Sequence, residues 1–344
     1  MYMYTQGHSR LISTGAYIPA QRVTSREIME QIDSVNRFDI RYDWLERTTG
    51  IYERRVAPDD IKPSDMAAKA ALEAMERGGV KPTEIDAIIY SGVIRDYLEP
   101  ATAHIVQHKL GASNAIAFDV SNACLGFMSA MHLMDSLIAT GQARRGLVVT
   151  GEKGYDYSQK ACGLLSKTQD RQIFHNLIAG LTIGDAGAAV IMGPKLAPDT
   201  GFMGFIAQSD GQFNNLCFAG GNKDGGPLVT NILEIVRETT KLVGPMYHEL
   251  MEKHLKWRPA ELNRYIPHQV GLKSVKKHAE VANVSLNIVP ITINFLGNIV
   301  SATIPVNLHL LSAKNQLALG EKIYLSGTGS GICLAQAGLV WDAA

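Results

Sequence analysis

Stretches with helical spacing of apolar residues alternate with short, continuous apolar runs along the whole chain. Residues 64–77 predict a helix that begins at Ser64 and ends at a pair of glycines. Residues 85–93 then predict a strand, and its apolar centre indicates burial on both faces. Because helix and strand keep alternating in this way, the pattern predicts an α/β fold.

An internal repeat is visible at an offset of 177 residues, where segment 81–89 resembles segment 258–266. A second pair of segments keeps the same order at nearly the same offset. Chance recurrence of a helix, a proline, an acidic turn and a strand is the alternative explanation. We expect two duplicated halves, residues 1–200 and 201–344, which pack face to face with an active site at their junction.

The amino-acid composition argues against two classes of binding partner, nucleic acids and membranes. The chain has 344 residues, 46% of them hydrophobic, and 33 basic residues balance 33 acidic ones. A neutral chain lacks the basic field that holds nucleic acid or an anionic membrane. No apolar run approaches the ~18 residues of a spanning helix, and no leader is evident. We therefore expect a soluble, cytoplasmic, unprocessed protein with neither membrane insertion nor nucleic acid as partner.

The four cysteines show neither paired spacing nor a disulfide framework, so no metal site is expected. Cys124 differs from the others because it follows a short apolar strand and opens an apolar helix that runs to about Ala139. Free N–H groups and the helix dipole would stabilise a thiolate there. An inert buried cysteine is the alternative for Cys124, and we expect Cys162, Cys217 and Cys333 to be inert.

Three further segments could complete a nucleophilic site. His268 follows the strand of the second half that matches residues 88–90 of the first, whereas other histidines fall in helical stretches. Asn298 follows Gly297 and stands, at an offset of 174, where Cys124 stands in the first half. The glycine-rich loop 327–331 can direct backbone N–H groups at an oxyanion but lacks a phosphate-loop lysine.

These segments resemble, in order and over nearly the whole chain, the thiolase-like condensing enzymes, most closely the beta-ketoacyl-ACP synthase III branch. The resemblance rests on segments 43–55, 119–127, 184–189 and 266–269, on Gly297-Asn298 and on the loop after Gly327. It implies a five-layered αβαβα fold and a homodimer.

The same resemblance implies a catalytic triad of Cys124, His268 and Asn298. Cys124 would be acylated by a thioester while its own N–H and the backbone near Ser330 hold the oxyanion. His268 and Asn298 would then stabilise the enolate of the second substrate, and a Claisen condensation follows. The substrates would be CoA or acyl-carrier-protein thioesters, with no cofactor, in fatty acid biosynthesis or lipid metabolism.

The resemblance also includes residues that bind CoA in the family. At one position, residue 99, this chain departs from the usual family sequence. Trp44 and Arg47 match positions that bind the CoA adenine, although one extra residue separates Arg47 from Gly50. Glu99 stands where primer-selecting members carry a phenylalanine that closes the acyl pocket of the partner subunit. The surrounding sequence looks like the olefin-biosynthesis branch, which joins two acyl-CoA molecules without decarboxylation. Glu99 is then the hypothetical base, and a solvated loop carboxylate is the alternative.

The sequence thus predicts an acyltransferase of beta-ketoacyl synthase III type that condenses an acyl-CoA. The second substrate is left open between malonyl-ACP, malonyl-CoA and another acyl-CoA, with acyl carrier protein as a candidate partner. Acyl transfer to a non-carbon acceptor and a non-catalytic partner subunit are the other hypotheses. Primer length is not readable from the sequence.

Overall fold

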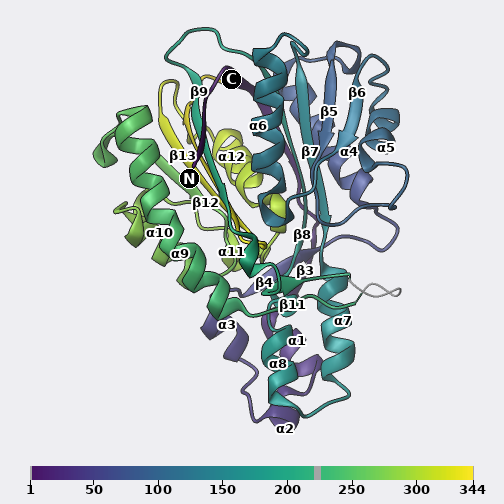
Figure 1. Cartoon of the computed structure of the whole chain (residues 1–344). Coiled ribbons are helices and arrows are strands. Elements are labelled where there is room, and N and C mark those ends of the chain that lie inside the picture. The colour runs from purple at the N-terminus through teal and green to yellow at the C-terminus, as the bar shows by residue number, and fades with distance from the viewer. Residues whose placement is uncertain (1, 221–225, 344) are drawn as a thin grey trace.

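Two five-stranded mixed sheets form the frame of the molecule, in a computed structural model that describes residues 2–220 and 226–343 (Figure 1). The first sheet has the order β2-β8-β7-β5-β6 and the second β1-β9-β14-β13-β12. The first-sheet strands are β2 (Ser9–Tyr17), β5 (Ala87–Tyr90), β6 (Ile116–Asp119), β7 (Gly146–Lys153) and β8 (Asp185–Pro194). The second-sheet strands are β1 (Met3–Gln6), β9 (Gly201–Ser209), β12 (Arg264–Pro267), β13 (Lys322–Gly329) and β14 (Cys333–Val340).

Both sheets repeat one strand arrangement. In the first, β2 pairs antiparallel with β8, β8 antiparallel with β7, and β7 parallel with β5. In the second, β9, β14, β13 and β12 follow one another with the same directions. The first sheet adds β6 at its edge, and the second adds the N-terminal strand β1. The division of the chain at residue 200 stays a prediction, and β1 lies in the second sheet.

Helices fill three layers around these sheets, which gives the predicted αβαβα order (Figure 1). The outer layer on the first sheet contains α4 (Pro63–Gly78) and α5 (Thr102–Leu110). The central layer contains α6 (Gly126–Ala139) and α12 (Thr303–Ala313). The outer layer on the second sheet contains α9 (Ile232–His248), the π-helical η5 (Glu249–Leu255) and α10 (Leu272–Val281).

Alternation along β5 shows how the layers are specified. Ala87 and Ile89 pack into the cluster that includes the central helices, whereas Ile88 and Tyr90 pack into the cluster formed with α4 and α5. Side chains point to opposite faces at successive strand positions, so a strand between two helix layers is apolar at every position. The predicted strand 85–93 was too long, because the chain leaves the sheet after Tyr90.

The predicted helix 64–77 is present as α4, but its N-cap is Lys62 rather than Ser64. Proline occupies the first helical position, where the absence of an N–H costs nothing. The Ser64 hydroxyl lies 2.6 Å from an Asp96 oxygen and therefore ties the helix start to the loop after β5.

A separate lobe extends below the sheets in Figure 1 and has its own apolar core. Its helices are α1 (Ser25–Gln31), α2 (Ser34–Phe38), α3 (Trp44–Thr49), α7 (Tyr155–Leu165) and α8 (Arg171–Leu177). The strands β3 (Gln21–Thr24) and β4 (Glu53–Val56) join it to the frame, and β10 (Cys217–Phe218) pairs with β11 (Val229–Thr230) nearby. The remaining short elements are η1 (Pro82–Glu84), η2 (Ala123–Leu125), η3 (Gly180–Thr182), η4 (Gly211–Phe213), η6 (Pro259–Glu261), η7 (Leu286–Ile288), α11 (Ile293–Leu296) and η8 (Val300–Ala302).

The two halves meet closely at Gly297, just before Asn298. Gly297 has φ +70°, and a Cβ atom there would lie 2.8 Å from the Thr182 carbonyl oxygen and 2.8 Å from Arg54 Cβ. The next residue donates its N–H to that Thr182 oxygen at 2.9 Å, which anchors Asn298 to the first half. No helix over the described residues is long and apolar enough to cross a membrane.

We predict that Gly297→Ala destabilises the fold more than Gly111→Ala. Both glycines have positive φ, but a Cβ at Gly111 meets no atom within 4 Å. Gly111→Ala should therefore lower the free energy of unfolding by about 1–2 kcal/mol through backbone strain alone. Gly297→Ala should add about 1–3 kcal/mol from the steric conflict. Denaturant unfolding checks this, and equal losses for both variants would contradict the close approach.

Candidate active site

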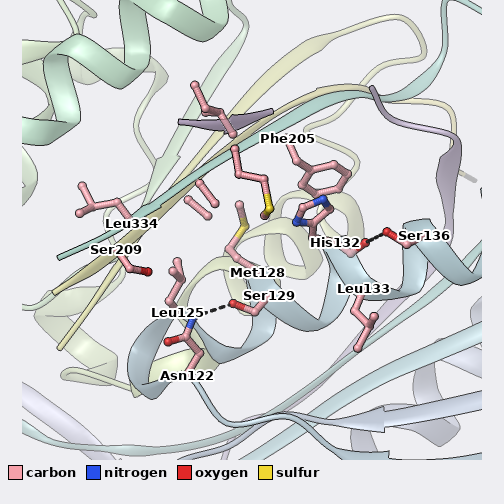
Figure 2. A pocket seen from close by; sticks show the side chains of 14 residues that line it. Asn122, Leu125, Met128, Ser129, His132, Leu133, Ser136, Phe205, Ser209 and Leu334 are labelled. Atoms are coloured by element: carbon pink, nitrogen blue, oxygen red, sulfur yellow. Dashed lines mark hydrogen bonds between the residues drawn. The ribbon is translucent and has the colours of Figure 1, made fainter. Parts of the chain in front are cut away.

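A cavity of about 370 Å³ lies between α6 and the second sheet. Figure 2 shows Met128 and Phe205 facing each other across it and Asn122 at the end near the start of α6. The Asn122 amide donates to Ser129 Oγ at 2.9 Å. The wall is largely apolar, and it includes residues on both sides of Cys124. Cys124, His268 and Asn298 are not among the residues that line this cavity, which reaches the Cys124 turn through Asn122 and Leu125.

Cys124 lies in the tight turn η2 between β6 and α6, so the helix itself begins two residues later than predicted. Ala123 before it has φ +48°, a left-handed conformation that few residues other than glycine adopt. The thiol is half-buried. Burial raises the pKa of Cys124 well above its ordinary value, helped by the negative charges of Cys217 and Glu152 when ionised. The expected stabilised thiolate is thus wrong for the free protein, and the thiol needs a proton acceptor.

His268 follows β12, as predicted, and is 2% exposed. Its backbone N–H donates to the Ser326 carbonyl of β13 at 2.8 Å, which fixes the residue at the sheet edge. Burial lowers the pKa of His268 to about 3, so the imidazole is neutral at physiological pH. Within the described residues neither ring nitrogen has a hydrogen-bond partner. A buried, unpaired imidazole is available to accept a proton from a thiol or to bind a substrate oxygen.

Asn298 is buried and held by its backbone and side chain together. Its carbonyl accepts from Gly184 N at 3.0 Å, and its Oδ1 accepts from Val300 N at 3.0 Å. Because Oδ1 is engaged in the turn, the amide NH₂ is left as the donor toward a ligand.

The elements that carry these three residues converge. The turn η2 packs against β13 and against η8, which follows Asn298, while β12 lies beside β13 and leads into His268. Glycines make this approach possible: a Cβ at Gly329 would lie 3.1 Å from Leu125 N. The roles of Cys124, His268 and Asn298 as a triad remain a prediction, and their elements meet at one place.

Ser330 closes the turn between β13 and β14 on the same side. The Cys333 thiol points to the Ser330 carbonyl at 3.5 Å and to the Asn122 carbonyl at 4.0 Å. Cys217 accepts a bond from Thr230 Oγ1 at 3.3 Å. The sequence did not indicate that these two cysteines lie close to the turn that carries Cys124, because they are distant from it along the chain.

Glu99 lies at the exposed tip of the loop between β5 and α5, so within one chain it faces solvent. Leu98 beside it is 97% exposed. The base of the loop is anchored, since both oxygens of Asp96 bind Ser64 and the Arg95 guanidinium lies 4.0 Å from Asp119. An anchored loop therefore presents an apolar side chain and a carboxylate to the outside.

Trp44 and Arg47 lie on α3, in the lobe rather than in the central cavity. The Trp44 ring packs edge-on against Phe174, and Arg47 is exposed, 3.6 Å from Asp43. The end of α3 contacts the start of α10, because a Cβ at Gly50 would lie 2.5 Å from the Leu272 side chain. The C-terminal end of α3 thus lies against the start of α10, which follows the loop after His268, and the role of Trp44 and Arg47 in CoA binding stays a prediction.

The sequence reasoning missed two buried carboxylates. Glu152 ends β7, and Asp185 opens β8 and accepts N–H bonds from Ala57 and Tyr155 at 2.8 and 2.7 Å. A charged residue at the end of an otherwise apolar strand was the available signal for Glu152. Among the described residues there is no group of three or more His, Cys, Asp or Glu side chains that could hold a metal ion.

Two family models match the chain, both for 3-oxoacyl-[acyl-carrier-protein] synthase III. One covers residues 118–211, and the model of the C-terminal part covers residues 252–341. These segments contain all three predicted triad residues.

Curated relatives span nearly the full length. The acyl-CoA:acyl-CoA alkyltransferase of Xanthomonas campestris is 33% identical over 93% of this chain and 94% of its own. The beta-ketoacyl-[acyl-carrier-protein] synthase III of Clostridium tetani is 30% identical over 96% of this chain and 98% of its own. A solved structure of Xanthomonas campestris OleA with lauric acid and lauroyl-CoA bound has a TM-score of 0.91 and 30% identity, covering 98% of this chain and 100% of that one.

The strand order, the helix layers and these full-length similarities agree with the predicted thiolase-like condensing fold. The chain is an acyl-transferring enzyme and belongs to the 3-oxoacyl-[acyl-carrier-protein] synthase III family, alongside the OleA-type acyl-CoA condensing enzymes.

Proposed function

We propose that this enzyme joins two acyl-CoA molecules head to head by a non-decarboxylating Claisen condensation. The observation that carries the proposal is Glu99, a carboxylate on an anchored, exposed loop. Removing an α proton from an acyl thioester needs a base, whereas loss of CO₂ from a malonyl unit creates the enolate without one.

The positions replaced in solved OleA variants support this choice. Structures of that relative exist with a cysteine, a glutamate or a histidine replaced; the glutamate lies 26 residues before the cysteine and the histidine 142 after it. Here Glu99 lies 25 residues before Cys124, and His268 lies 144 after it. The agreement in spacing favours Glu99 as the counterpart of that glutamate.

The first half-reaction acylates Cys124. The thiol transfers its proton to the neutral His268, the sulfur attacks the thioester carbonyl, and the carbon–sulfur bond to CoA breaks. The proton then passes to the departing CoA thiolate. Backbone N–H groups of Cys124 and of the loop at Ser330 hold the oxyanion. Burial helps here, because hydrogen bonds to a developing charge are stronger where water is excluded.

In the second half-reaction Glu99 takes an α proton from another acyl-CoA. The Asn298 amide and His268 hold the enolate oxygen while the α carbon attacks the acyl-Cys124 carbonyl. The carbon–sulfur bond to Cys124 breaks, the proton taken by Glu99 returns to the Cys124 thiolate, and the product is a 2-alkyl-3-oxoacyl-CoA. One CoA is released for each carbon–carbon bond.

We propose a homodimer in which Glu99 acts in the partner subunit. Within one chain this carboxylate faces solvent, and exposed Tyr97 and Leu98 stand next to it. The edge strand β6 leads to Cys124 and, among the residues that the structure describes, pairs on one side only, with β5. An unpaired edge strand can extend a sheet across a subunit interface.

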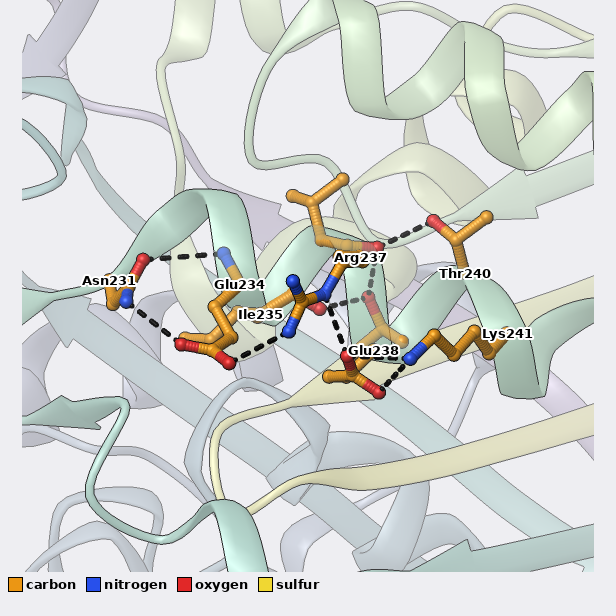
Figure 3. Close-up of polar contacts among 9 residues, drawn as sticks. Asn231, Glu234, Ile235, Arg237, Glu238, Thr240 and Lys241 are labelled. Carbon is orange, nitrogen blue, oxygen red and sulfur yellow. Dashed lines mark hydrogen bonds and ion pairs between the residues drawn. The ribbon is translucent and has the colours of Figure 1, made fainter.

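The substrates need a basic entry surface, for CoA phosphates or for an acidic acyl carrier protein. Lys273 and Lys276 are exposed on α10, next to α3 with its exposed Arg47. By contrast, Figure 3 shows Arg237 and Lys241 of α9 both bound to Glu238, and Arg237 also bound to Glu234, so two carboxylates compensate two cations. We propose that thioesters enter at the α3–α10 edge, without a cofactor, in the lipid metabolism of the cytoplasm.

We predict that long-chain acyl-CoA alone gives a β-keto product and one CoA per condensation. Mass spectrometry of the extracted products and a thiol assay measure this. An acyl adduct on Cys124 that forms without any new carbon–carbon bond would indicate transfer to another acceptor. A product that forms only after malonyl-CoA or malonyl-ACP is added would replace the proposal by the decarboxylating reaction.

We predict that Glu99→Gln lowers the rate with acyl-CoA alone by about 10²-fold or more and leaves Cys124 acylation intact. Loss of the base removes enolate formation but not the first half-reaction. Glu76→Gln changes another exposed carboxylate, at the end of α4, and serves as the control. Equal rates for Glu99→Gln and the control would remove Glu99 as the base.

We predict that Cys124→Ala abolishes the acyl adduct, whereas Cys162→Ala retains it. Cys162 is buried in the core of the lobe, away from the central cavity. Intact-mass measurement after incubation with acyl-CoA checks both variants. An adduct that persists in Cys124→Ala would place the nucleophile elsewhere.

A further inference from the structure

A buried carboxyl group joins the two segments on which the proposed reaction depends. Glu152, at the end of β7, is 0% exposed. Its oxygens accept from Val93 N at 3.1 Å and Ile94 N at 3.4 Å, at the base of the Glu99 loop. Ser301, three residues after Asn298, contacts the same carboxyl with its N–H at 3.3 Å and its hydroxyl oxygen at 2.5 Å.

The hydroxyl of Ser301 limits the protonation state of this cluster. Its oxygen lies 2.5 Å from Glu152 Oε1, 3.0 Å from the Ser91 carbonyl and 3.0 Å from Thr150 Oγ1. A hydroxyl has one proton to donate, and a carbonyl can only accept. If Glu152 were a carboxylate, Ser301 could satisfy Glu152 or Ser91 but not both. If Glu152 carries a proton, it donates to Ser301 and Ser301 donates to Ser91, so every contact is a hydrogen bond.

We propose that Glu152 is a neutral carboxylic acid that serves as a positioning residue, locking the Glu99 loop to the Asn298 segment through Ser301. Its consequence for turnover rests on the roles proposed above for Glu99 and Asn298. Ionisation of Glu152 redirects the Ser301 proton away from Ser91, the last residue before that loop. The Ser301–Ser91 hydrogen bond, which ties the Asn298 segment directly to the start of the loop, is therefore made only while the carboxyl is protonated.

The electrostatic surroundings agree with this geometry. Burial raises the pKa of Glu152 to about 7, against the hydrogen bonds from Ser301, Val93 and Ile94, which lower it. No ion pair of Glu152 occurs within the described part of the chain. The titratable groups that face it are Tyr90 from β5, Tyr157 from α7 and Cys124 from η2, and each has its pKa raised by the charge of Glu152. The Ser91–Ile94 and η8 segments contribute no titratable side chain.

A thiol-alkylation experiment tests the proposal without any acyl substrate, so its result is independent of the condensation reaction. Iodoacetamide modification of Cys124 is followed by peptide mass spectrometry from pH 6 to 9 in the wild type and in Glu152→Gln. Below the pKa of Cys124 the rate should rise tenfold per pH unit in the variant. In the wild type the rise should flatten near pH 7, because a newly charged Glu152 raises the pKa of the thiol.

We expect Glu152→Gln to react about threefold faster than the wild type at pH 8.5 and equally fast at pH 6, a shift of about half a pKa unit. Asp185→Asn is the matched control, because burial raises the pKa of Asp185 to about 6 but Asp185 contacts other elements. It should follow the wild-type profile. A rate ratio that does not change with pH, or the same change in the control, overturns the proposal.

If Glu152→Gln does not fold, infrared spectroscopy can measure the protonation of the Glu152 carboxyl directly as a function of pH. In the Asp185→Asn protein, the carbonyl band of a buried protonated carboxyl should be present at pH 5.5 and lost by pH 8.5. Ser301→Ala, introduced into the same protein, should shift that band by removing the hydrogen bond to Glu152. A band that is absent at pH 5.5 or that ignores Ser301→Ala overturns the proposal.

Discussion

Exclusion of water from the space between the two sheets controls the chemistry of this enzyme. Burial keeps the Cys124 thiol protonated, keeps His268 neutral with a pKa of about 3, and raises the pKa of Glu152 to about 7. The same effect acts on an acid, a base and a thiol in the direction that removes charge. Burial thus favours the uncharged form of each of these three groups.

This arrangement depends on backbone contact between two halves that repeat one topology. Cys124 follows Ala123, with φ +48°, and Asn298 follows Gly297, with φ +70°. The 3₁₀ turns η2 and η8 each begin at a non-glycine residue with positive φ, Ala123 (φ +48°) and Val300 (φ +51°), and a central helix follows each turn. The repeated turn thus matches Cys124 to Ser301, and Asn298 lies two residues before η8.

The sequence predicted those features that depend on local pattern. Periodicity and glycines gave the alternating helices and strands, and strand-end positions gave Cys124 and His268 as candidates. The protonation state of the Cys124 thiol was not predictable from the sequence. A position at the start of a helix favours a thiolate, but segments that are distant in sequence bury the thiol and raise its pKa. The Glu152–Ser301 contact joins residues 149 positions apart. Only the fold shows that Cys217 and Cys333 approach the turn that carries Cys124, since nothing in their own neighbours indicates it.

Glu99 lies apart from the buried cluster. It is exposed at the tip of its loop, whereas Glu152 is 0% exposed and holds the base of that loop through Val93 and Ile94. The proposed base must reach the α carbon of a bound substrate, and an exposed loop tip can do so where a partner subunit or a substrate covers it. The fixed carboxyl at 152 then sets the position of the loop base, while the proposed base at 99 stays at the loop tip, so one loop links a buried carboxyl contact to an exposed carboxyl group.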